Sequence, residues 1–216
     1  MTLDQFWKII SDSREGFDPR HDCERNLATQ ADCLKQLLMA MPSQEVQGFV
    51  ATYSHLSLSA NRWDLWAAGH IIATWNGGGC GDDGFDDFQR WLIAQGREVF
   101  EAALRDPESL VDVASRPGIA GSCMFEEFLY VPDRVLQMRG EEMPDDLGPP
   151  VEDWPEEPLG ERWEDEDLPG RFPKLWSAFG TGTTGAASNA ADNQPMQRRA
   201  GILSNIRRWF GRGPGR

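Results

Sequence analysis

The sequence lacks several features that would assign it to a familiar class of protein. Its four cysteines, Cys23, Cys33, Cys80 and Cys123, include no CxxC pair and no spacing typical of zinc sites, which favours ordinary thiols in a reducing compartment. The N-terminus, MTLDQFWKII, has no basic region and no small-residue cleavage site, so no secretory signal is expected. No apolar run is long enough to span a bilayer. These absences together predict a cytoplasmic protein.

Motifs for nucleotides and metals are missing as well. The glycine-rich turn from Gly77 to Asp87 contains no GxGxxG after a strand, and no Lys-Ser or Lys-Thr pair follows it. Its aspartates, in the order DDGFDD, do not match the alternating ligand positions of an EF-hand loop. We therefore expect no cofactor and no metal site.

Positive charge is scarce outside the C-terminus. The chain of 216 residues has a formal net charge of −14, yet six of its 21 basic residues are arginines within the last 19 positions. The rest carries 15 basic against 35 acidic residues, a net charge of −20. Such a body repels phosphates, which argues against direct nucleic-acid binding by the core and favours a basic partner.

Helical periodicity, by contrast, is abundant, and no convincing alternating strand is present. Thr2 and Gln5 have capping-box spacing ahead of a first helix, and Ser43 is a plausible N-cap of a third. Apolar residues surround most of the segment 61–75, which predicts a central buried helix. The next segment, 85–104, continues the period, with a kink expected at Gly96. The predicted fold is an all-α, compact multi-helix domain.

Composition divides the chain into four parts. Residues 1–140 form the helical core, and residues 141–180 are an acidic, Pro-rich and Trp-rich extension. Its large apolar side chains predict that it packs on the core rather than remaining free. Residues 181–200, rich in Gly, Ala, Ser and Thr, form a flexible linker, and residues 201–216 a basic tail.

The tail is predicted to be a short amphipathic helix. One face carries apolar side chains and the other carries arginines, a pattern that suits an anionic membrane, an acidic partner or the acidic body of the same chain. Self-docking is favoured because the linker keeps the tail near that body. The expected contact residues are Ile202, Leu203, Ile206, Arg207, Arg208, Trp209 and Phe210.

Five segments carry a resemblance to a known family. They are FWKII, WDLWAAGHII, GGGCGDDGFDDFQRWLIAQGREVFEAAL, FEEFLYV and RFPKLWSAF. Together, over roughly Met1 to Phe179, the chain resembles an uncharacterised bacterial family catalogued as domain of unknown function 4240. No established activity, cofactor or catalytic residue comes with this resemblance. The family resembles a module found alone or within larger regulatory proteins, which implies interaction rather than chemistry.

Unusual residues cluster only at the Gly77–Asp87 turn. Asp82, Asp83, Asp86 and Asp87 lie at a helix start, where carboxylates stabilise free backbone amides; the alternatives are a general binding surface or a hard cation. His70 and Cys80 are weak candidates for a nucleophilic pair, although a lone histidine on such a helix is more often a hydrogen-bonded core residue.

Three functions therefore stay open. The first is a noncatalytic intracellular protein-interaction or regulatory module. The second is a small hydrolase-type enzyme that uses the turn. The third is peripheral membrane or partner anchoring through the tail.

Overall fold

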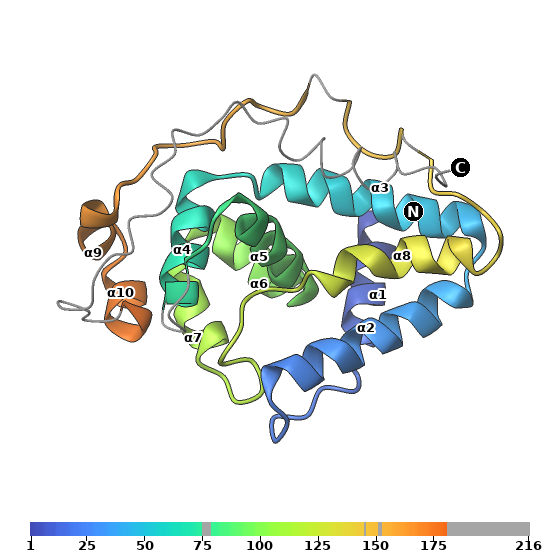
Figure 1. The fold of residues 1–216 in the computed structure, drawn as a ribbon, viewed down its shortest axis with the longest axis horizontal. Coiled ribbons are helices and arrows are strands. Elements are labelled where there is room, and N and C mark those ends of the chain that lie inside the picture. The colour runs from blue at the N-terminus through green and yellow to red at the C-terminus, as the bar shows by residue number, and fades with distance from the viewer. Residues whose placement is uncertain (75–78, 145, 151–152, 181–216) are drawn as a thin grey trace, which may run out of the picture.

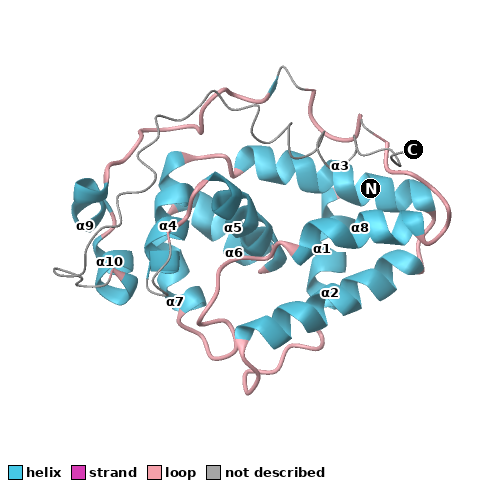
Figure 2. Ribbon diagram, in the orientation of Figure 1, coloured by secondary structure: helices cyan, strands magenta, loops and turns pink. Residues whose placement is uncertain are grey.

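The structure is a computed structural model that describes residues 1–74, 79–144, 146–150 and 153–180. The predicted linker and the predicted tail helix lie outside these described residues, as do Gly77 and Gly78 of the turn. The described chain is all-α and contains no strand, only an isolated parallel bridge between Arg62 and Leu159 (Figure 2).

Ten α-helices and two short 3-10 helices make up the described chain. They are α1 (Leu3–Ser13), α2 (Cys23–Met39), α3 (Ser43–Ser59), α4 (Trp63–Thr74), α5 (Asp82–Ala94), α6 (Arg97–Arg105), η1 (Pro107–Ser109), α7 (Leu110–Ala114), α8 (Glu127–Gln137), η3 (Asp165–Asp167), α9 (Leu168–Arg171) and α10 (Pro173–Phe179).

Local sequence signals explain several helix boundaries. The capping box at Thr2 and Gln5 is present, and the side chain of Asp106 accepts the backbone N–H of Glu108 at the start of η1. Gly96 does more than bend one long helix. Its φ of 99° lies in the left-handed region that favours glycine, so the chain ends α5 and starts α6 there.

Ser43 was predicted to be the N-cap of α3, but it is the first residue of the helix. Pro42 is the N-cap residue and has no side-chain cap, while the Ser43 hydroxyl donates to Glu141 Oε1 at 2.7 Å and accepts from Arg139 Nη1 at 2.9 Å. The Ser43 hydroxyl therefore does not cap the helix. It connects the start of α3 to the chain that follows α8.

A row of aromatic rings runs through the core. Trp63, Trp66 and Phe85 stack with centroid separations of 5.1 and 4.9 Å, and the row continues through Phe88 to Trp91. All five side chains are buried, as the apolar periodicity of the segments 61–75 and 85–104 predicts. The row joins α4 to α5, and Gly69 permits their close approach because an added Cβ would lie 2.8 Å from the Phe88 ring.

The acidic extension packs on the helical core. We call residues 153–180 the acidic arm. In Figure 1 the chain after α8 passes along the outside of α3, and the arm ends with α9 and α10 beside α4. Leu168, Phe172, Leu175 and Phe179 of the arm are all buried. The predicted packing is therefore confirmed, and the end of the arm is helical rather than extended.

Candidate functional site

His70 lies where the turn, α4 and the acidic arm meet. Its Nδ1 accepts the backbone N–H of Cys80 at 3.3 Å, and its Nε2 is 3.8 Å from Asp165 Oδ1. The imidazole also contacts the Trp163 ring, with centroids 5.0 Å apart. The side chain keeps 23% of its surface exposed, so it is not enclosed in an apolar core. Burial nevertheless lowers the pKa of His70, although Asp165 opposes this effect.

Cys80 contributes its backbone rather than its thiol to this contact. Its carbonyl accepts the Trp66 indole N–H at 2.6 Å, and its N–H goes to His70. The thiol is buried, and burial, followed by the neighbouring Cys123, raises its pKa far above that of a free cysteine. A nucleophilic pair needs a thiolate that the imidazole can deprotonate. The two residues are neighbours, but the contact between them is not of this kind.

The four aspartates of the turn separate into two pairs. Asp82 and Asp83 are exposed in the first turn of α5. Asp86 is buried, and Asp87 is partly buried and forms an ion pair with Arg90. Burial raises the pKa of Asp87, and the positive charge of Arg90 opposes this rise. Only the first pair is exposed to solvent.

Arg90 is the buried cation that the sequence reasoning missed. Burial tends to lower the pKa of its guanidinium, but Tyr53, Asp87 and Asp86 raise it further than burial lowers it. A buried charge needs such counterions, since removing them leaves it without solvation. Asp86 and Asp87 therefore have a structural role. The clue in the sequence was the spacing of Asp86 and Asp87, four and three positions before Arg90, which places the three charges on one side of a helix.

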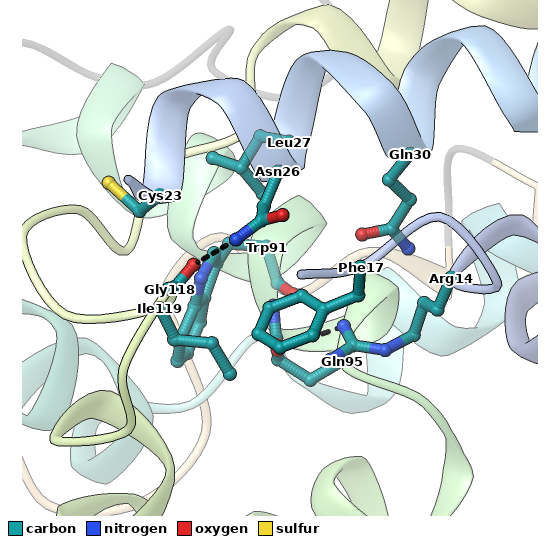
Figure 3. A pocket seen from close by; sticks show the side chains of 10 residues that line it. All are labelled: Arg14, Phe17, Cys23, Asn26, Leu27, Gln30, Trp91, Gln95, Gly118 and Ile119. Carbon is teal, nitrogen blue, oxygen red and sulfur yellow. Dashed lines mark hydrogen bonds between the residues drawn. The ribbon is translucent and has the colours of Figure 1, made fainter. Parts of the chain in front are cut away.

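A small, partly open pocket lies between α2, the end of α5 and the loop after α7 (Figure 3). Its polar side chains already have partners. Arg14 Nη1 and Gln30 Nε2 donate to the carbonyl of Ala94, and Asn26 Nδ2 donates to the carbonyl of Gly118. These bonds satisfy the backbone carbonyl at the end of α5 and hold the loop after α7 in place. The polar side chains of the pocket therefore have a structural role.

Hydrogen bonds at three places join the acidic arm to the core. Leu159 exchanges backbone hydrogen bonds with Asn61 and Trp63, at 2.8 and 2.9 Å. The Trp163 indole donates to the Trp63 carbonyl at 3.0 Å. At the start of α10, the Glu108 carboxylate accepts the backbone N–H groups of Lys174 and Leu175.

The outer surface of the arm is strongly acidic. Leu168, Phe172, Leu175 and Phe179 turn inward. Eight carboxylates of the arm are exposed: Asp153, Glu156, Glu157, Glu161, Glu164, Asp165, Glu166 and Asp167. The two arginines that approach them do so at long range, 3.9 Å from Arg162 to Glu164 and 4.0 Å from Arg171 to Glu161. The arm therefore presents a band of negative charge to solvent.

The band and the turn belong to one surface. Cys80, just before α5, contacts His70, and His70 faces Asp165 of the arm. The exposed Asp82 and Asp83 follow Cys80 by two and three positions, so the chain brings them near the contact between His70 and the arm. We call the eight carboxylates of the arm together with Asp82 and Asp83 the acidic face.

Within the described residues, no three His, Cys, Asp or Glu side chains group in a way that would hold a metal ion. No helix among these residues combines the length and the apolar character that crossing a bilayer requires.

The described chain is a compact bundle of α-helices with an acidic arm packed on it. The comparison with protein families then gives a match over residues 1–137, more than half of the chain, to the family described as Protein of unknown function (DUF4240). The chain belongs to this family. Neither the comparison with curated proteins nor that with solved structures gives a match. The expected resemblance is confirmed, and the family match ends before the acidic arm.

Proposed function

We propose that this protein is a noncatalytic, intracellular interaction module that binds a basic protein partner through its acidic face. The observation that supports the proposal most directly is the orientation of the arm. Its apolar side chains fix it to the core, and its eight carboxylates point to solvent. Complementary charge of this kind steers a cationic partner and orients it on the surface.

The chemistry around the turn supports interaction over hydrolysis. Hydrolysis by a nucleophilic pair would need an accessible, ionisable thiol, but Cys80 is buried and its pKa is raised. Asp86 and Asp87 serve as counterions of Arg90. The intracellular part of the proposal draws on the four cysteines, all of which are free thiols.

Charge reversal tests the proposal. Glu156 and Glu157 are exposed and have no ion pair within the described chain, so replacing both with lysine should change the surface without disturbing the packing. A matched control replaces Glu15 and Asp32, two exposed acidic residues on the α1–α2 side, in the same way. Both variants change the net charge by the same amount.

The readout is affinity purification from the native cell at two salt concentrations. We expect wild type and the control to retain one stoichiometric basic partner, and the variant at Glu156 and Glu157 to lose it. Higher salt should weaken the retained complex, because exposed charges are screened. Equal retention by both variants would contradict the proposal.

The basic tail supplies a second binding element in this proposal. Its arginines and apolar residues suit an anionic membrane surface or the acidic face of the same chain, with self-docking favoured by the short linker. Sedimentation with anionic vesicles separates the two outcomes. Self-docking predicts that a peptide of residues 201–216 sediments while the full chain does not. Sedimentation of both indicates membrane anchoring.

A further inference from the structure

Arg14 carries a positive charge that no carboxylate of the described chain neutralises. Its Nη1 donates to two neutral acceptors, the Ala94 carbonyl and Gln95 Oε1, both at 3.0 Å. No ion pair among the described residues includes it, although the chain has 35 acidic residues. Burial lowers the pKa of its guanidinium, and the nearby Arg116 lowers it further. The charge is therefore available to an anion from outside the chain.

The donors that Arg14 leaves unused form the edge of the guanidinium that binds oxyanions. The end of α5 occupies Nη1, whereas Nε and Nη2 have no partner within the described residues. Neither atom belongs to the buried polar atoms that lack a partner, so both reach solvent. Their N–H groups lie side by side in one plane and match the two oxygens of a carboxylate. Because the bonds of Nη1 hold the guanidinium in place, this edge is preorganised.

The pocket beside Arg14 supplies apolar surface next to this edge. Phe17 and Leu27 line it and are half-buried, and the Phe17 ring centroid is 5.7 Å from Arg14 Cζ (Figure 3). Trp91 and Ile119 line it as well and are buried. The pocket is small and partly open, so it suits a carboxylate with its first few carbon atoms rather than a whole cofactor.

Charge favours a carboxylate over a phosphate at this edge. A phosphate group carries close to two negative charges at neutral pH, and the net charge of −20 outside the tail repels a dianion more strongly than a monoanion. Arg116 is exposed on the loop after α7 and is the neighbouring cation of Arg14. It adds attraction for a single negative charge.

We propose that Arg14 and this pocket form a binding site for a small organic monocarboxylate. The Nε and Nη2 groups of Arg14 donate to the two carboxylate oxygens, while Phe17 and Leu27 cover the first carbon atoms. Arg116 attracts the anion from solution. Arg14 is the C-cap of α1 and bonds to the end of α5, so binding strengthens the junction of these helices with α2. The site shares no residue with the acidic face and is independent of the proposed function.

Titration of the full chain with butyrate and with butyramide tests the site. The amide has nearly the shape of the acid but no charge. At constant ionic strength, butyrate should shift the Nε–H resonance of Arg14 and the indole resonance of Trp91 to a saturable end point. Butyramide should bind about tenfold more weakly or less. Equal binding of the two compounds, or shifts that do not saturate, would overturn the site.

Three variants identify the donors. Arg14→Lys keeps the charge but not the planar pair of N–H groups, so it should weaken butyrate binding about tenfold or more. Arg116→Gln should weaken it roughly two- to fivefold, because this exposed charge acts through solvent. Arg105→Gln removes the same charge from α6, which contributes no residue to the pocket, and should leave binding unchanged.

The exposed position of Arg116 keeps the inference testable if Arg14→Lys fails to fold. Unchanged binding in Arg14→Lys, or equal binding in Arg116→Gln and Arg105→Gln, contradicts the assignment. The resonance of Arg14 should also be independent of protein concentration. A change with protein concentration would mean that a carboxylate of another copy occupies the edge, and the small-molecule site would then be wrong.

Discussion

Replacing Leu175 with alanine measures how firmly α10 anchors the acidic arm. The side chain is fully buried on a helix that packs against α4 and α7. Deleting such a side chain costs about 2–5 kcal/mol, and the lower half of this range applies where the surroundings can relax. Because α10 is a short helix at the edge of the bundle, we expect about 2–3 kcal/mol.

The loss should concentrate in the arm. The arm depends on α10 for its position. Each 2 kcal/mol lost should make the amides of α9 and α10 exchange roughly 30-fold faster. The amides of α1 and α3 should remain protected. Urea unfolding, followed by circular dichroism, measures the remaining stability of the core. Hydrogen exchange with mass spectrometry localises the change.

Leu159 provides a matched control in the same arm. Its side chain is 56% exposed, and its contact with α4 uses backbone atoms that alanine retains. Leu159→Ala should therefore change stability by less than about 0.5 kcal/mol. If Leu175→Ala proves equally mild, α10 does not anchor the arm and the docking argument is wrong.

Three other perturbations test the site. Under native conditions a thiol reagent should modify the half-exposed Cys33 first and the three buried cysteines only on unfolding. Fast labelling of Cys80 would instead support a nucleophilic role for its thiol. Arg90→Met should cost about 3–5 kcal/mol by urea titration, because it leaves buried carboxylates without a counterion, while the exposed Arg25→Met should be near neutral. Glu108→Ala should destabilise the arm by about 1 kcal/mol in the same assay, because it removes the acceptor at the start of α10. Glu108→Gln should cost less, since it keeps an acceptor oxygen. Equal losses would argue against a capping role for Glu108.

Helix positions were largely predictable because they depend on local signals. These signals act within one or two helical turns. Examples are the capping box at Thr2, the N-cap at Asp106 and the apolar residues around most of α4. The break at Gly96 was predicted only as a kink. Its left-handed backbone angle belongs to the three-dimensional turn between α5 and α6, and periodicity cannot show such an angle.

The candidate site was less predictable, since it depends on contacts between distant segments. Tyr53 reaches Arg90 only because α3 packs beside α5, whereas Asp86 and Asp87 lie within one or two turns of Arg90 on the same helix. The cap that Glu108 provides for α10 joins residues 66 and 67 positions apart. Packing of the arm was predictable in kind from its Trp and Phe residues, but its partners on the core were not.

Arg139 has a consequence for how the chain folds during synthesis. Its Nη2 donates to the carbonyls of Leu38, Met39 and Met41, and so completes the end of α2 from 98 to 101 positions downstream. Because N-terminal segments emerge from the ribosome first, α2 must wait for almost half of the protein to be translated before its last turn is satisfied. Until then water is the hydrogen-bond partner of these carbonyls, so the last turn of α2 gains its protein partner only after α8 has been synthesised.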